Sequence, residues 1–107
     1  ERFAEAARSA SPPSATTVSV HLCDVTRGNR TVRARSVTPP NERWGLGGGI
    51  VSTASPAAAA VRLLARKRIT ATGALPPERC IDPDEMFAEL ETRGVRFDVR
   101  EMEEVAS

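Results

Sequence analysis

Four glycines among the five residues Gly45–Gly49 constrain this chain more than any other feature of its sequence. Glycine in an ordered segment usually serves a positive φ or the close approach of a backbone or a ligand. Ser55-Pro56 follows, a hydroxyl N-cap with proline at the first helical position, which predicts a helix from Pro56 to about Lys67. Two interpretations stay open: a tight crossing beneath a β-hairpin, or bare backbone that lines a ligand cleft.

The glycine run does not fit a nucleotide-binding motif. In the frame that starts at Gly45, the Gly-x-Gly-x-x-Gly pattern needs a sixth-position glycine, where Ile50 stands. An acidic residue should follow about twenty positions later, and Ala65 stands there. No Lys-Ser or Lys-Thr pair follows the glycines, so a P-loop is also excluded. We therefore expect no cofactor site in this chain.

A cleft at this segment would offer backbone donors, hydroxyl groups, one tryptophan as a wall and one arginine as a carboxylate clamp. The candidate substrate-binding residues are Arg43, Trp44, Gly47, Gly48, Gly49, Ser52, Thr53 and Ser55. The sequence indicates no catalytic acid or base. A metal site lacks support, because His21 is the only histidine and the two cysteines, Cys23 and Cys80, are far apart in sequence.

Alternating apolar and polar residues predict a β-hairpin over 16–37. One strand covers Thr16–Val25, the turn contains Gly28-Asn29, and the returning strand covers Arg30–Val37. This hairpin precedes the glycine segment, which opens a region over 44–99.

Within 44–99 a second helix and a closing strand are expected after a Pro-Pro loop. Asp82-Pro83 predicts the helix start and Gly94 its C-terminal end. Alternation at Val95, Phe97 and Val99 predicts the strand, whose partner the sequence does not indicate. Residues 1–10 are interpreted as a helix remnant and 100–107 as a frayed tail. These elements predict one α+β domain over 1–107, with a small antiparallel or mixed sheet and two main helices on one face.

Charge is unevenly distributed although the net charge is only +1. Residues 27–77 hold nine basic residues and one acidic residue, whereas 78–107 hold ten acidic and four basic residues. We expect the two halves to pack together and neutralise each other. A nucleic-acid partner is the alternative, but no aromatic residues interleave the arginines, so none is expected. No apolar run is long enough to span a bilayer, which predicts a soluble chain without membrane contact. A cytoplasmic location is a separate expectation, in line with cysteines that are expected to stay reduced.

Several motifs together resemble the C-terminal part of saccharopine dehydrogenase-like oxidoreductases. The resemblance covers roughly 47–99 well and the hairpin loosely. In that family a Gly/Thr-rich strand runs into a Pro-Ala-Ala helix, followed by a Gly-x-x-Pro-Pro-Glu loop, a Leu-x-x-Arg-Gly helix end and a closing strand. The matching residues are Thr53, Pro56-Ala57-Ala58, Gly73, Pro76-Pro77-Glu78, Leu90 and Arg93-Gly94. Ala54 departs from the pattern, because the family commonly has a glycine shortly before the helix proline.

This resemblance implies a substrate-side and dimerisation domain of an NAD(P)-dependent oxidoreductase. It implies that the chain is a fragment of a longer protein, whose own N-terminal Rossmann domain holds NAD(P). A homodimer, a small amino-acid-like substrate and no activity of the isolated chain are expected on the same ground. The alternative is a stand-alone oligomerisation or interaction module without a ligand.

Overall fold

The structure, a computed structural model, describes residues 1–10 and 14–103. Its first strands, β1 (Ser19–Arg27) and β2 (Arg30–Thr38), form an antiparallel hairpin. The two-residue loop between them contains Gly28 with φ 62°, a conformation that glycine adopts at little cost. The hairpin predicted over 16–37 is therefore confirmed, although β1 begins only at Ser19.

The closing strand, β3 (Arg96–Glu103), pairs antiparallel with β2, so the sheet order is β1-β2-β3. This supplies the partner that the sequence left open. The strand also takes in the first acidic residues of the expected tail, because Glu101 and Glu103 lie opposite Val32 and Arg30. The prediction of a frayed tail is thus wrong for residues 100–103, and residues 104–107 lie outside the described part of the chain.

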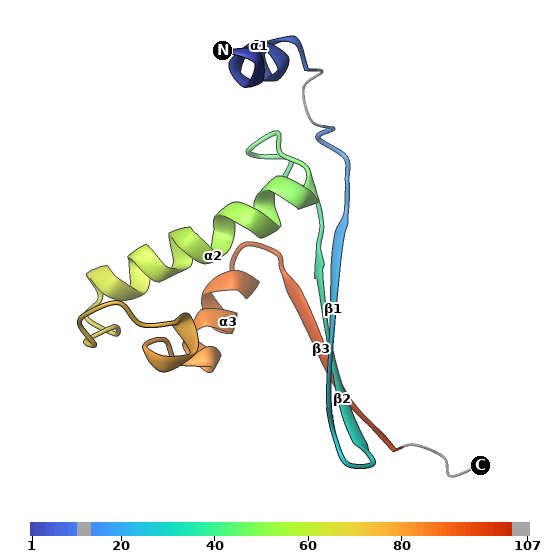
Figure 1. The fold of residues 1–107 in the computed structure, drawn as a ribbon, viewed down its shortest axis with the longest axis vertical. Helices are drawn as coiled ribbons and strands as arrows, with labels where there is room; N and C mark the ends of the chain where they lie inside the picture. The colour runs from blue at the N-terminus through green and yellow to red at the C-terminus, as the bar shows by residue number, and fades with distance from the viewer. Residues whose placement is uncertain (11–13, 104–107) are drawn as a thin grey trace.

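The two main helices, α2 (Gly48–Ala65) and α3 (Pro83–Glu91), lie on the same side of the sheet (Figure 1). A short 3₁₀ helix, η1 (Pro77–Arg79), lies between them in sequence. Asp82 caps α3 as predicted, with its Oδ1 accepting a 2.9 Å hydrogen bond from the amide of Asp84. Gly94 follows α3 with φ 86°. The predicted α+β fold, a small antiparallel sheet with helices on one face, is confirmed.

Helix α2 begins at Gly48, so the predicted start at Pro56 is wrong. The buried positions Val51, Ser55, Ala59 and Leu63 follow one another at intervals of four residues. This stripe continues past Pro56, which lies exposed on another side of the helix. Pro56 has no N–H and cannot donate a backbone hydrogen bond to the carbonyl oxygen of Ser52. Packing along the buried stripe offsets the loss of this hydrogen bond.

The earlier start gives α2 18 residues with a mean hydropathy of 1.2. By length and composition alone such a helix could cross a membrane, which corrects the expectation that no apolar run is long enough. In this fold α2 instead packs one side against α3 and the first two strands.

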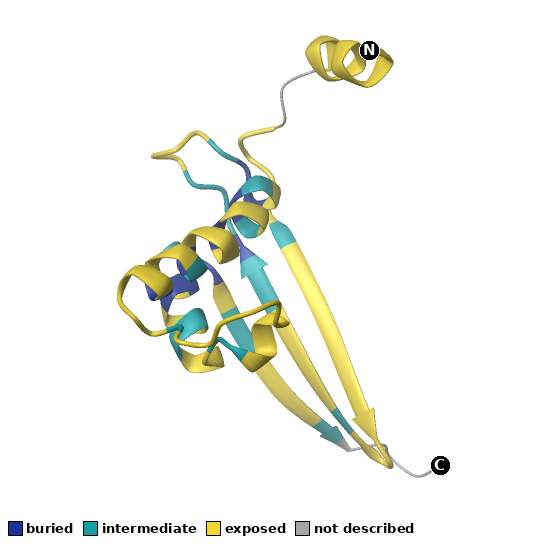
Figure 2. Ribbon diagram, turned by 60° about the vertical axis from the view of Figure 1, so that its left-hand side comes forward, coloured by how far each residue is buried: buried dark blue, intermediate teal, exposed yellow. Residues whose placement is uncertain are grey.

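The hydrophobic core is small and lies between the two helices and the near end of the sheet (Figure 2). Its buried apolar side chains are Val51, Ala59, Leu63, Leu90 and Val95. Phe97 extends the core onto β3, and its ring lies 4.7 Å from that of Phe87 on α3. The far half of the sheet receives no cover from either helix.

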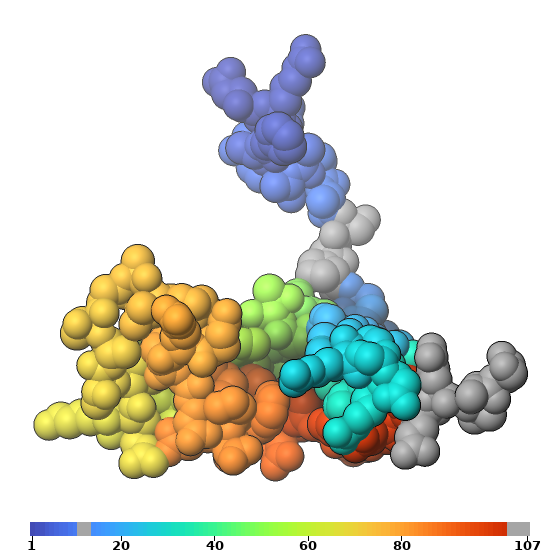
Figure 3. All heavy atoms as spheres, turned by 60° about the horizontal axis from the view of Figure 1, so that its bottom comes forward, coloured from blue at the N-terminus to red at the C-terminus, as the bar shows by residue number. Residues whose placement is uncertain are grey.

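Helix α1 (Arg2–Ser9) confirms the helix expected at 1–10, and none of its residues is buried. It stands away from the remainder of the molecule (Figure 3). The accessible surface is 8677 Å², whereas a compact 11.5 kDa protein exposes about 5,800 Å². The radius of gyration is 17.6 Å, against about 13 Å expected for this length. The chain by itself therefore leaves an unusually large surface uncovered.

Candidate functional site

The eight candidate residues divide into two groups that the structure does not bring together. Arg43 and Trp44 line an open hollow between the loop after β2, the outer side of α2 and the end of α3. The other six, from Gly47 to Ser55, lie in the first two turns of α2 or directly before it, and none of them lines this hollow.

The backbone of Gly47 and Gly48 crosses tightly against the chain that enters β1. The amide of Gly48 donates a 2.7 Å hydrogen bond to the carbonyl oxygen of Thr17. A Cβ at Gly48 would overlap the carbonyl oxygen of Thr38 and approach the amide nitrogen of Ser19 to 2.8 Å. These two glycines thus serve the crossing beneath the hairpin, the first of the two interpretations. Gly49, by contrast, has open space around it.

The hydroxyl groups at the start of α2 are engaged within the fold. Ser52 and Thr53 both donate to the carbonyl oxygen of Gly49, at 3.0 and 2.9 Å. The hydroxyl of Ser52 also reaches that of Ser19 on β1 at 3.4 Å. Ser55 is only 3% exposed. These groups stabilise the first turns of α2, and none of them lines the hollow beside Arg43 and Trp44.

A closed loop holds Trp44 in place at the hollow. Asn41 and Leu46 exchange two backbone hydrogen bonds, of 2.8 and 3.2 Å, across the base of this loop. The side chain of Asn41 accepts a further 3.0 Å hydrogen bond from the amide of Trp44. Gly45 takes a φ of 63°, which closes the turn. The loop therefore presents a half-exposed indole from a fixed backbone.

The hollow has a volume of about 710 Å³, within the range of small-molecule sites. Its lining consists of Pro39, Pro40, Asn41, Glu42, Arg43, Trp44, Arg62, Thr92, Arg93 and Gly94. Three arginines and one glutamate belong to this lining, but Arg62 and Arg93 also pair with the carboxylate of Glu89. Arg43, for which no ion pair is found in the described part of the chain, is therefore the main candidate for binding an anionic ligand. This lining contains no histidine or cysteine.

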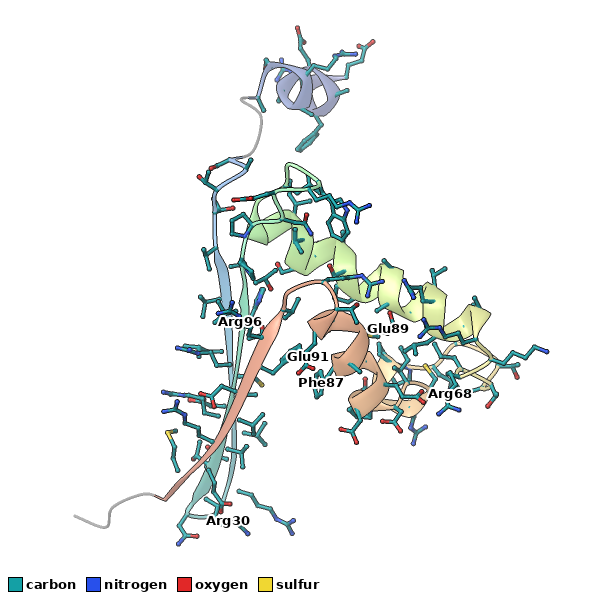
Figure 4. All side chains as sticks on the ribbon, turned by 180° about the vertical axis from the view of Figure 1, so that it is seen from behind. Arg30, Arg68, Phe87, Glu89, Glu91 and Arg96 are labelled. Carbon is teal, nitrogen blue, oxygen red and sulfur yellow. The ribbon has the colours of Figure 1, made fainter. Side chains whose placement is uncertain are left out.

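A buried carboxylate stands behind the hollow and connects the two helices. Glu89 on α3 forms ion pairs with Arg66 at 2.5 Å, Arg93 at 3.1 Å and Arg62 at 3.3 Å. The hydrogen bond from Arg93 and the charges of Arg62 and Arg66 hold the pKa of Glu89 below its ordinary value, against the opposing effect of burial. Figure 4 labels Glu89 on the α3 ribbon.

Sequence reasoning missed this cluster, although the basic end of α2 and the acidic first half of α3 were its signal. Arg68 and Glu85 pair in the same way, with the Nε of Arg68 2.6 Å from the carboxylate. At the tip of the sheet Arg30 pairs with Glu101 at 2.6 Å. The basic and acidic halves of the sequence thus lie against each other, as expected.

The hairpin arginines, which an anionic partner would need, are partly neutralised by a neighbouring carboxylate. Arg33 donates from Nε and Nη2 to the two carboxylate oxygens of Asp24, at 2.8 and 2.7 Å. This bidentate hydrogen bonding lowers the pKa of Asp24. The pairing leaves less positive charge on the sheet for a nucleic acid.

The sheet itself leaves apolar side chains uncovered on both faces (Figure 2). Val20 and Leu22 lie on the face turned away from the helices, and both are more than half exposed. Val25 and Val99 lie on the helix-facing side beyond the reach of α3, and they are equally exposed. Figure 4 shows Phe87 near the sheet and Arg30 at the far tip of the hairpin.

Comparisons with protein-family models, characterised proteins and solved structures find no match to this chain. In residues 1–10 and 14–103 no group of three or more metal-ligating side chains comes together.

Proposed function

We propose that this chain is the substrate-side and dimerisation domain of a cytoplasmic, saccharopine dehydrogenase-like NAD(P)-dependent oxidoreductase. In this role its sheet packs against other folded surfaces, and its hollow receives part of a small, amino-acid-like substrate. The motifs over 47–99 support the assignment to this family. The uncovered surface supports a role in contacts with another domain and with a second copy.

The observation that best supports the proposal is the large accessible surface of the chain, here called the surface excess. The chain exposes about 2,900 Å² more than a compact protein of its mass, as the difference between 8677 Å² and the expected 5,800 Å². A standard interface covers about 800 Å² on each partner, and an obligate interface covers more. This excess, to which the exposed helix α1 also contributes, is larger than one standard interface needs on one partner. We infer that it serves contacts with a cofactor domain of the same protein and with a second copy.

The glycine segment supports the proposal that a second domain binds the cofactor. Gly47 and Gly48 are sealed against backbone, so the segment does not fit the pyrophosphate of a dinucleotide. NAD(P) supplies the hydride when bound, and its site belongs to the partner domain. Arg43 and Trp44 hold the substrate: the guanidinium binds a carboxylate and the indole packs against the apolar part.

The test compares the isolated chain with a version extended by the residues that its gene encodes before Glu1. Calorimetry should detect no NAD(P)H binding to the isolated chain. The extended protein should bind NAD(P)H and oxidise it when supplied with a 2-oxo acid and an amino acid. Micromolar NAD(P)H binding by the isolated chain, or none by the extended protein, would contradict the proposal.

A second candidate, a stand-alone oligomerisation or interaction module, draws support from the same exposed sheet. It needs neither the hollow nor a cofactor domain. An oligomer that shows no response of Trp44 to small carboxylates, and whose gene encodes no dinucleotide-binding domain, would favour this candidate over the first.

A further inference from the structure

The two edges of the sheet differ in how well they are protected against pairing. Edge strand β3 has five charged residues among eight, namely Arg96, Asp98, Arg100, Glu101 and Glu103. Edge strand β1 reads SVHLCDVTR, with no lysine, no proline and charge only at Asp24 and Arg27, leaving His21 aside. Natural proteins shield free edges with charge, proline or bulges. Only the β3 edge carries such protection.

The unprotected edge presents both backbone groups and apolar side chains. In a hairpin with a two-residue loop the closing pair, Arg27 and Arg30, is hydrogen-bonded, and bonded pairs alternate along the strand. Val20 and Leu22 therefore direct their N–H and C=O groups outward, away from β2. Their side chains, 53% and 61% exposed, lie side by side on the outer face.

We propose that β1 pairs antiparallel with β1 of a second copy of this chain, which joins the two sheets into one of six strands. The inference rests on the proposed function, whose dimerisation role it assigns to one element. A two-fold axis at His21 sets Val20 opposite Leu22 of the second copy, and Leu22 opposite its Val20. This register forms a four-residue apolar ladder on the outer face.

The edge fits its own copy better than a charged partner. Asp24, the one acidic residue of β1, already holds Arg33 through two hydrogen bonds. The stretch from Val18 to Cys23 is free of fixed charge, so two copies meet without like-charge repulsion.

The experiment measures the mass of the full chain in solution and the hydrogen exchange of its amides. Sedimentation should give a dimer of twice 11.5 kDa. The amides of Val20 and Leu22 should be protected in the unmodified chain, although each lies on a free edge of the isolated fold. Leu22→Lys should raise the dimer dissociation constant by about tenfold or more, because it sets a charge within the ladder.

Val99→Lys is the matched control. Val99 is 64% exposed against 61% for Leu22, and it lies on the other edge strand and the other face. This variant should stay dimeric with β1 protected. A monomer at about 100 μM, equal dissociation by both variants, or a dimer whose β1 amides exchange freely would overturn the inference.

The exchange experiment needs no variant, so poor folding of Leu22→Lys leaves the test intact. A monomeric chain whose extended form still oxidises NAD(P)H would overturn the dimer alone. A protected β1 dimer whose extended form binds no NAD(P)H would overturn the oxidoreductase assignment alone.

Discussion

Gly48 and Thr17 are joined by a 2.7 Å backbone hydrogen bond that fixes the first residue of α2 to the chain entering β1. The contact brings helix and strand backbones closer than any side chain would permit. Gly49, one position later, faces open space. Gly48 therefore leaves no room for a side chain, whereas the neighbouring Gly49 does.

Alanine substitution should separate these two glycines. Gly48→Ala places a Cβ against the carbonyl oxygen of Thr38 and should destabilise the fold by several kcal/mol, about the cost of a severe core clash. Gly49→Ala should be neutral or stabilising by up to about 1 kcal/mol, because alanine favours the helix. Urea denaturation of both variants measures the difference. Equal effects would contradict the tight crossing.

The small core should depend on one side of α2. Leu63 is 3% exposed and its neighbour Leu64 is 58% exposed. Leu63→Ala should cost about 2–5 kcal/mol of unfolding free energy, whereas Leu64→Ala should cost well below about 1 kcal/mol. Thermal unfolding followed by circular dichroism compares the pair. A larger loss at Leu64 would show that this side of the helix is covered in solution.

Acid should weaken the connection between α2 and α3. Since its three arginine partners lower the pKa of Glu89 in the folded state, the unfolded chain binds this proton more readily. The stabilisation is complete above the ordinary carboxyl pKa and is lost as the pH falls through the lowered value. Glu89→Gln should lower the Tm by about 5 °C at neutral pH, and the difference should shrink near about pH 3.

Glu91→Gln provides the control for that pH series. Glu91 lies on the same helix, is exposed, and forms no ion pair with any residue in the described part of the chain. Its Tm should follow that of the unmodified protein at every pH. A constant gap between Glu89→Gln and the unmodified protein down to pH 3 would contradict a charge-based role.

Trp44 is the only tryptophan, so its fluorescence reports directly on the hollow. Titration with 3-phenylpropanoate should change the emission saturably, whereas the neutral 3-phenylpropanamide should bind more weakly. Arg43→Gln should weaken binding by about tenfold, the value of one charge-assisted hydrogen bond. Arg79→Gln removes a surface arginine outside the hollow and should have no effect. Equal binding of acid and amide would contradict a carboxylate clamp.

The sequence predicted the fold well at turns and helix ends, where a particular residue type has one usual structural role. Gly28 marked the hairpin turn, Asp82 the start of α3 and Gly94 its end, and each has the expected geometry. The partner of β3 could not be predicted, because antiparallel pairing of segments far apart in sequence leaves no local pattern.

The start of α2 and the composition of the site show where local reasoning fails. Ser55-Pro56 has the residue types of a helix start, but the buried stripe that decides the matter begins at Val51. Arg43 and Trp44 were found from their residue types. Arg62 and Arg93 were missed, because only the packing of α2 beside α3 brings them to the same hollow.

The position of β2 at the centre of the sheet has a consequence for biosynthesis. One of its neighbours, β1, precedes it directly, but the other, β3, is translated only after both main helices. While both main helices are translated, β2 can therefore pair only with β1, and its other edge has no partner. Completing the sheet is a late, slow event, and nascent chains stalled before Arg96 would expose β2 to misassembly with their neighbours.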